Sequence, residues 1–140
     1  MRQILLFAAL AASLALLSGC TLSKAKADTA EDMSDKAAYH KLSAEEAYEM
    51  MASQEVVVVD VRTREEYDGG HIENAVLVPN ESIDSEMPET LPDKDATLLV
   101  YCRSGRRSKD AAQKLLALGY QSVYDFGGVI DWPYELVKEG

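Results

Sequence analysis

The sequence predicts an α/β fold, in which a central, mostly parallel sheet is flanked by helices. Short apolar runs alternate along the chain with helical patterns, which is typical of a parallel sheet covered by helices. The runs 56–59 and 98–101 contain no alternating polar residues, so both faces of these strands are expected to be buried. The 140 residues have room for one domain of ordinary size.

The first half of the predicted domain contains two helices, each opened by a capping box. Ser-x-x-Glu spacing predicts a helix over 43–52, and Thr-x-x-Glu spacing predicts a short helix over 63–67, which two glycines end. Between them, the four valines of 56–59 predict an interior strand. Residues 75–78 predict another short strand, stopped by a proline, and the polar stretch 81–87 is compatible with a helix.

The second half of the domain continues the alternation of strands and helices. A strand over 98–101 leads through a loop into a helix whose apolar residues recur at helical spacing up to Leu118. Gly119 supplies the C-terminal stop of this helix. Residues 122–124 predict a last strand, and residues 132–138 predict a C-terminal helix.

The N-terminus has the pattern of an export signal. A short cationic start is followed by 14 uncharged, apolar residues, 4–17, and then by small residues before Cys20. Fourteen residues at ~1.5 Å each cover roughly 21 Å, short of a ~30 Å hydrocarbon core, which favours a cleaved signal over a membrane span. The ending Leu-Ser-Gly-Cys resembles the lipobox of bacterial lipoproteins, which implies cleavage before Cys20 and lipid on its sulfur. An ordinary secretory signal with a chance cysteine is the alternative.

The lipobox resemblance divides the chain into three parts. Residues 1–19 are a signal peptide, residues 20–39 are the lipidated N-terminus and a flexible polar tether, and residues 40–140 are the folded domain. The resemblance also implies an exported protein of the bacterial cell envelope, which a lipid anchor holds on the periplasmic or extracytoplasmic face of a membrane.

The charge balance excludes some partners. The chain carries 14 basic and 24 acidic residues, a net charge of −10, so it is a poor candidate for binding nucleic acid or anionic lipid surfaces. The basic residues are unevenly placed, however, because Arg103, Arg106 and Arg107 all follow closely after Cys102. A local positive site in an acidic protein favours a small anionic substrate, and an ordinary solvated loop is the alternative.

Cys102 is the candidate nucleophile. It follows the strand over 98–101 and precedes a helix, so free N–H groups and the positive end of the helix dipole are expected to favour its thiolate. Asp60 falls at the carboxyl end of another predicted strand, the edge at which parallel sheets bind ligands. If Cys20 carries lipid, Cys102 is the only free thiol, and no intramolecular disulfide is possible.

Loop length separates the chemistries that use a cysteine held by backbone amides: phosphoryl transfer, arsenate reduction and sulfur transfer. Phosphate-ester enzymes have the pattern Cys-x5-Arg, a loop wide enough for a tetrahedral phosphoryl group. Here Arg107 gives the pattern Cys-x4-Arg, and Ser108 stands where the longer loop would have its arginine. The shorter loop favours a smaller cargo, a second sulfur atom on Cys102, over a phosphatase or an arsenate reductase.

Several motifs together resemble those of the single-domain rhodanese (thiosulfate sulfurtransferase) family, over about residues 40–140. The motifs are Val59-Asp60-Val61-Arg62 with Glu65-Glu66-Tyr67, Gly70-His71-Ile72-Glu73-Asn74-Ala75, the active loop from Cys102 to Ser108, and Phe126-Gly127-Gly128 with Trp132. Family members commonly have proline and glycine in place of Glu73 and Asn74. This departure affects a turn and not the reacting groups.

The resemblance implies a rhodanese-like fold and a persulfide mechanism, with thiosulfate:cyanide sulfurtransferase activity. The Cys102 thiolate attacks the outer sulfur of thiosulfate or a similar donor, sulfite leaves, and a thiol or cyanide acceptor then takes the sulfur. No metal or organic cofactor is implied. A module that carries the persulfide to a dedicated partner remains an alternative, since both roles need a reactive Cys102.

Five loop residues are expected to bind the anionic sulfur cargo through N–H and guanidinium groups: Arg103, Ser104, Gly105, Arg106 and Arg107. A tight loop with inward N–H groups also requires a residue at the Gly105 position that tolerates positive φ.

The remaining motif residues are expected to support the site or the core. Asp60 is expected to fix loop N–H groups or to pair with an arginine, and Arg62 to support the site or form a surface pair. His71 is expected to be a hydrogen-bonded structural histidine rather than a general base. Trp132 is expected to pack in the core or at its rim.

Overall fold

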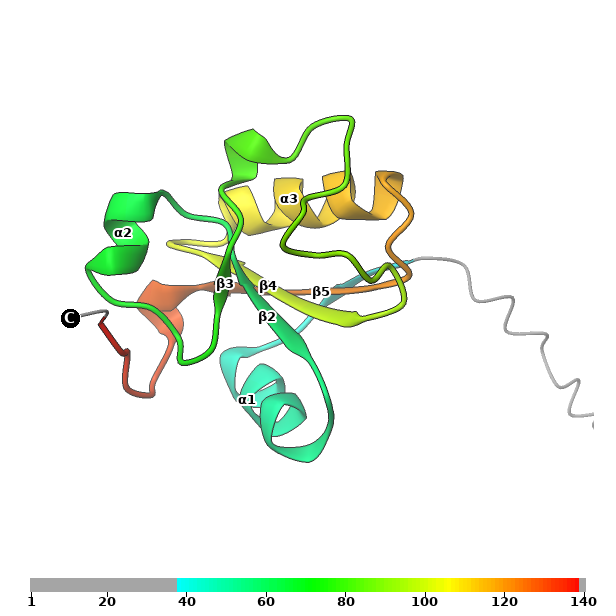
Figure 1. Ribbon diagram of the computed structural model, residues 1–140. Helices are drawn as coiled ribbons and strands as arrows, with labels where there is room; N and C mark the ends of the chain where they lie inside the picture. The colour runs from blue at the N-terminus through cyan, green and yellow to red at the C-terminus, as the bar shows by residue number, and fades with distance from the viewer. Residues whose placement is uncertain (1–37, 139–140) are drawn as a thin grey trace, which may run out of the picture. The chain divides into compact units, whose positions relative to one another are not determined.

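The computed structural model describes residues 38–138, which contain a five-stranded parallel sheet with helices on both faces (Figure 1). Its strands are β1 (Ala38–Lys41), β2 (Val57–Asp60), β3 (Val76–Leu77), β4 (Thr97–Cys102) and β5 (Ser122–Gly128). Their spatial order is β1-β5-β4-β2-β3, and each pairing is parallel. The predicted α/β class and the interior position of the four-valine strand are both confirmed.

Three α-helices accompany the sheet: α1 (Ala44–Ser53), α2 (Arg64–Asp68) and α3 (Arg106–Ala117). Figure 1 shows α3 on one face of the sheet and α1 on the other. Both predicted capping boxes are present, because the side chains of Ser43 and Thr63 accept hydrogen bonds from the backbone N–H groups of Glu46 and Glu66 and the glutamates reciprocate. Of the polar stretch 81–87, only the start is helical, in the 3₁₀ turn η1 (Asn80–Ser82).

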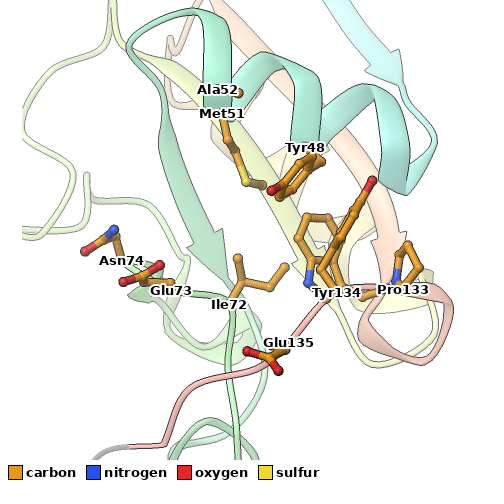
Figure 2. A pocket seen from close by; sticks show the side chains of 10 residues that line it. Tyr48, Met51, Ala52, Ile72, Glu73, Asn74, Pro133, Tyr134 and Glu135 are labelled. Carbon is orange, nitrogen blue, oxygen red and sulfur yellow. The ribbon is translucent and has the colours of Figure 1, made fainter.

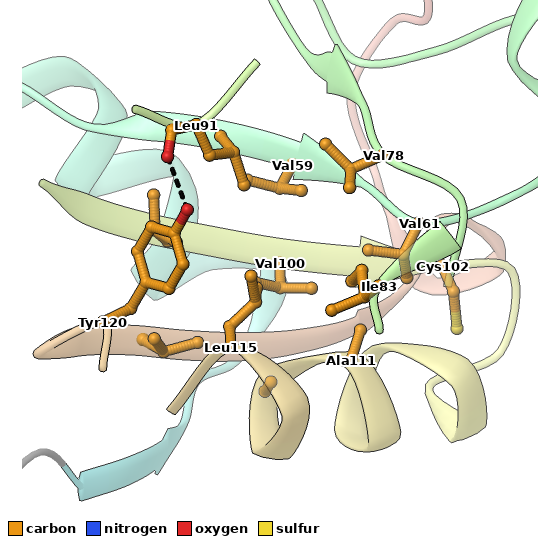
Figure 3. Packing of buried hydrophobic residues seen from close by; sticks show 13 residues of the cluster. Val59, Val61, Val78, Ile83, Leu91, Val100, Cys102, Ala111, Leu115 and Tyr120 are labelled. Atoms are coloured by element: carbon orange, nitrogen blue, oxygen red, sulfur yellow. Dashed lines mark hydrogen bonds between the residues drawn. The ribbon is translucent and has the colours of Figure 1, made fainter. Parts of the chain in front are cut away.

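The apolar run that forms β4 contributes to the core on both faces of the sheet. Leu98, Val100 and Cys102 lie in the cluster beside α3, which Figure 3 shows, whereas Leu99 and Tyr101 lie in the cluster on the α1 side. Burying each such aliphatic side chain stabilises the fold by about 1.5–3 kcal/mol relative to leaving it exposed. The lack of polar alternation in the sequence therefore reflects a strand with two covered faces.

The first strand was not predicted from the sequence, which assigned residues 38 and 39 to the tether. β1 starts at Ala38, two residues before the expected domain start at residue 40, and it pairs with β5 in the register Ala38↔Ser122. The predicted signal peptide, Cys20 and the tether as far as residue 37 lie outside the described residues. Among the helices that the structure describes, none is long and apolar enough to span a bilayer.

Two predictions for the C-terminal part are wrong. β5 does not end at residue 124 but continues to Gly128, because Gly128 pairs with Cys102 of β4. The helix expected over 132–138 is absent, and only a 3₁₀ turn, η2 (Val129–Asp131), precedes that segment. Pro133 lacks a backbone N–H and disfavours helical φ and ψ in the residue before it.

The segment after Pro133 instead pairs with the turn that follows α2. The backbone N–H of His71 donates to the carbonyl of Val137 at 2.9 Å, and the N–H of Val137 donates back to His71 at 2.8 Å. These partners are 66 positions apart by their residue numbers, so local sequence patterns contain no signal for this bridge.

Candidate active site

The central feature of the site is the loop that carries Cys102 from the carboxyl end of β4 to the start of α3. The backbone N–H of Gly105 donates to the Cys102 sulfur at 3.0 Å, and Cys102 is only 1% exposed. Gly105 has φ +97°, so the predicted need for positive φ at this position is confirmed. A left-handed residue at the N-cap of α3 turns the chain so that its N–H groups face the sulfur.

The loop lies in direct backbone contact with the end of β5. A Cβ atom on Gly128 would lie 2.1 Å from the carbonyl oxygen of Arg103, and one on Gly105 would lie 3.4 Å from the Cα atom of Gly127. Glycine is therefore required at residue 128 by the close approach of two chain segments, and the Phe-Gly-Gly motif has a steric explanation.

Hydrogen bonds from the loop and α3 favour the thiolate form of Cys102. Burial raises the pKa of this thiol, but hydrogen bonds from Ser108 and from the backbone N–H groups of Gly105 and Ser104 outweigh burial and lower it below its usual value. The direction agrees with the expectation from sequence. The main cause is the ring of hydrogen-bond donors rather than the neighbouring arginines.

Arg107 is engaged by a residue that the sequence analysis did not place in the site. Its two terminal nitrogens each donate to a different carboxylate oxygen of Glu66 on α2, both at 2.8 Å. The hydrogen bonds from Arg107 are the main reason that the pKa of Glu66 falls to about 2. The Arg107 guanidinium, which was expected to bind the sulfur donor, is thus already paired with the Glu66 carboxylate.

The other two loop arginines remain available to solvent. Arg103 and Arg106 are exposed, as is Ser104, and neither arginine forms an ion pair with any residue that the structure describes. The local positive charge of the loop therefore comes from these two side chains.

Asp60 and Arg62 form a buried pair at the end of β2, and no hydrogen bond or ion pair among the described residues joins either of them to a loop arginine. The Arg62 guanidinium donates to Asp60 at 2.6 Å and to the carbonyl of Gly70 at 2.8 Å. The Tyr101 hydroxyl also donates to Asp60, at 2.6 Å, and accepts the N–H of Ile72 at 3.1 Å. Since Tyr101 directly precedes Cys102, this network fixes the strand end that presents the nucleophile.

The remaining motif residues have structural contacts. The Nδ1 atom of His71 lies 2.9 Å from the carbonyl oxygen of Tyr67, and its ring stacks on the Tyr67 ring at 3.6 Å. Trp132 is buried against Phe126, with 5.6 Å between ring centroids. Asn74 has φ +62°, a conformation that asparagine tolerates better than most residues, which explains how it occupies a position where the resembled family commonly has glycine.

Asp125 is a buried carboxylate beneath the loop that the sequence analysis missed. It is 1% exposed and lies in β5, where its oxygens accept hydrogen bonds from Ser108, Tyr39, Lys41 and the Gly127 N–H. An aspartate inside the run Val-Tyr-Asp-Phe was the available signal, because acidic residues are rarely buried without a partner.

Two hollows lie near the carboxyl edge of the sheet. A groove of about 660 Å³ between α1 and the segment after η2 is lined by Tyr48, Met51, Trp132 and Tyr134 but by no residue of the Cys102 loop (Figure 2). A shallower cleft of about 310 Å³ includes Arg103. Within residues 38–138, no three potential metal-ligating side chains come together.

Fold and site together define a protein with a thiolate-stabilising cysteine loop at the carboxyl edge of a parallel α/β sheet. Residues 43–133 match the family model of the rhodanese-like domain, and the chain belongs to this family. The family supports sulfur-transfer chemistry in general.

Three relatives illustrate the similarity. A tRNA uridine(34) hydroxylase of Photorhabdus laumondii is 34% identical over 104 residues, which cover 71% of this chain but only 30% of that protein. A rhodanese-related protein of Thermoplasma volcanium has a TM-score of 0.62 at 29% identity, over 72% of this chain and all of the other. A human single-domain sulfurtransferase, TSTD1, has a TM-score of 0.59 at 26% identity, over 66% of this chain and 93% of the other.

The buried Asp60–Arg62 pair predicts a large stability effect. Arg62→Gln leaves the Asp60 carboxylate buried without its cation, and we expect a loss of about 3–5 kcal/mol in the free energy of unfolding, measured with urea. Arg64→Gln is the matched control, because the Arg64–Asp68 pair is 3.8 Å long with side chains 68% and 51% exposed, and its loss is expected to cost less than about 1 kcal/mol. Equal costs for the two variants would contradict the assigned role of the buried pair.

The Glu66–Arg107 pair predicts that both residues act by positioning the loop. Arg107→Ala and Glu66→Gln are each expected to lower kcat/KM for sulfur transfer by about fivefold, which corresponds to about 1 kcal/mol for a half-buried pair. Steady-state kinetics with thiosulfate check this. If Arg107 instead binds the donor directly, Glu66→Gln frees its guanidinium and lowers KM, which would contradict the positioning role.

Proposed function

We propose that this protein is a sulfurtransferase in which Cys102 carries a sulfur atom as a persulfide between an anionic donor and a thiophilic acceptor. The observation that carries the proposal is the Cys102 sulfur at 3.0 Å from the Gly105 N–H, inside a loop that lowers its pKa. Such a group is a strong nucleophile near neutral pH without a separate general base.

The reaction takes place in two displacements on sulfur. The Cys102 thiolate attacks the outer sulfur of thiosulfate, a new S–S bond forms, and sulfite leaves with the electron pair of the broken S–S bond. The persulfide anion then lies where the loop N–H groups already stabilise negative charge. An acceptor thiolate or cyanide attacks the outer sulfur, and Cys102 leaves as the thiolate, so the cycle needs no further oxidant or reductant.

Thiosulfate or a donor of the same charge fits the site because two exposed arginines give the loop a local positive charge. Arg103 and Arg106 are exposed beside Cys102, whereas the whole chain has a net charge of −10. We expect these two side chains to attract the donor, and the loop N–H groups to hold the transferred sulfur.

The acceptor is proposed to be a thiol or cyanide rather than RNA. The matched hydroxylase of Photorhabdus laumondii is named for a tRNA substrate, but this chain spans only 30% of its length. The net charge of −10 opposes binding to a polyanion. A carrier that delivers its persulfide to one partner protein is the second candidate, favoured by the 1% exposure of Cys102, which restricts access to the sulfur.

The loop length argues against the phosphatase and arsenate reductase alternatives. With the pattern Cys-x4-Arg, a phosphoryl group would lack some N–H donors that a longer loop supplies. Each missing oxyanion donor costs about 3–4 kcal/mol in the transition state.

The protein is further proposed to be a lipoprotein of the bacterial cell envelope. The Leu-Ser-Gly-Cys sequence at residues 17–20 supports lipidation of Cys20, with residues 21–37 linking the anchor to the domain. Wild-type protein is expected to partition into detergent and the Cys20→Ala variant to remain in the aqueous phase. Equal partitioning of both variants would contradict the anchor.

Intact mass after thiosulfate treatment tests the catalytic proposal. In a Cys20→Ala background, where Cys102 is the only thiol, the protein is expected to become one sulfur atom heavier and to lose that atom on addition of cyanide. Cys102→Ser in the same background is the control and should not change in mass. Repeated turnover with cyanide identifies an enzyme, and a stable persulfide without turnover identifies a carrier. Hydrolysis of an aryl phosphate without persulfide formation would overturn the proposal.

A further inference from the structure

The Ser108 hydroxyl has four possible acceptors that compete for its single proton. Ser108 is completely buried in the first turn of α3, and hydrogen bonds from its N–H and its hydroxyl contribute to the lowered pKa of Cys102. The same hydroxyl lies 2.6 Å from an oxygen of Asp125, 3.1 Å from the carbonyl of Gly105 and 3.2 Å from the carbonyl of Gly127. A hydroxyl has one proton, so it donates fully to only one of these groups.

Asp125 is the strongest acceptor in this set. It is ionised, because its hydrogen bonds with Ser108, Tyr39, Gly127 and Lys41 outweigh the effect of burial and lower its pKa. Its contact with Ser108 is also the shortest that the hydroxyl makes. Short O–H···O contacts to a carboxylate are markedly stronger than those to a neutral carbonyl.

We infer that Asp125 is a positioning residue for the nucleophile: it accepts the main hydrogen bond of the Ser108 hydroxyl and thereby weakens the hydrogen bond from that hydroxyl to the Cys102 thiolate. The inference rests on the proposed role of Cys102. A thiolate with fewer donors has a higher pKa and is intrinsically more nucleophilic. Asp125 therefore limits how far the loop stabilises the thiolate and keeps the sulfur reactive.

The same carboxylate connects β1 to the loop. Tyr39 donates to the second oxygen of Asp125 at 2.7 Å, and Lys41 donates to that oxygen at 3.2 Å. Both residues precede the part of the chain that matches the family model, 43–133. Because Tyr39 contacts Asp125 but does not bond to Ser108, it provides a control for the carboxylate's role.

The other charged residues around the loop are the same in every variant used to test this inference. They come from β2 and the segment that follows it, α2, η1, the loop and α3, and they are Asp60, Arg62, Glu66, Glu81, Arg103, Arg106, Arg107 and Asp110. Any difference among variants at Asp125, Ser108 and Tyr39 therefore arises within the network described here.

The pH dependence of Cys102 alkylation by iodoacetamide tests the inference, in a Cys20→Ala background with folding checked by thermal unfolding. Ser108→Ala is expected to raise the midpoint by at most about 0.3 pH units, because its hydroxyl donates mainly to Asp125 and only weakly to the sulfur. Asp125→Asn removes the charged acceptor, so the Ser108 hydroxyl donates its hydrogen bond to the thiolate instead. The alkylation midpoint then falls by about one pH unit. The limiting rate at high pH falls about threefold.

The double variant separates the hydroxyl from a simple charge effect. In the Ser108→Ala background, Asp125→Asn should shift the alkylation midpoint by less than half of the shift that it causes when Ser108 is present. Tyr39→Phe alone should change neither the midpoint nor the limiting rate. A midpoint raised by about one unit in Ser108→Ala would overturn the inference, as would equal Asp125→Asn shifts in both backgrounds. If the Asp125→Asn variant does not fold, the alkylation midpoint of the Ser108→Ala variant alone tests the inference. Alkylation needs no sulfur transfer, so failure here is distinct from failure of the proposed function.

Discussion

The backbone contact between the Cys102 loop and the end of β5 is the constraint on which the site depends. A side chain at residue 128 would collide with the Arg103 carbonyl, and Gly105 needs a left-handed φ of +97° to turn the chain back over its own sulfur. The β4–β5 pairing, with Cys102 opposite Gly128, holds the two segments together. The N–H groups therefore face the sulfur before any substrate binds, which is electrostatic preorganisation achieved by backbone geometry.

Polar contacts from three sides hold this loop in place. Asp60 and Tyr101 fix the end of β4, Glu66 connects Arg107 to α2, and Asp125 connects Ser108 to β5. Each contact joins residues of different elements, 17 or 41 positions apart in the sequence. Each buried or half-buried charge has an opposite charge or hydrogen-bond donors beside it. The positive charge that remains exposed, on Arg103 and Arg106, is therefore free to attract an anionic donor.

The sequence predicted the features that local patterns determine. Both capping boxes, the buried strand before Cys102 and the positive φ at Gly105 are confirmed, because helix caps and tight turns depend on neighbouring residues. The features it missed depend on non-local pairing. The strand at 38–41 exists through its contact with β5, and the segment around Val137 pairs with His71 instead of forming a helix. Likewise, no sequence pattern indicated that Glu66 would form an ion pair with Arg107.

The central claim is that backbone donors, and not the charge of the loop arginines, stabilise the Cys102 thiolate. The most direct test compares the alkylation midpoint of wild-type protein with that of the Arg103→Ala/Arg106→Ala double variant, in which all N–H donors remain. We expect a midpoint below the ~8.5 of a free cysteine in both proteins. A wild-type midpoint at or above ~8.5 would contradict the account, and so would a return to ~8.5 in the double variant.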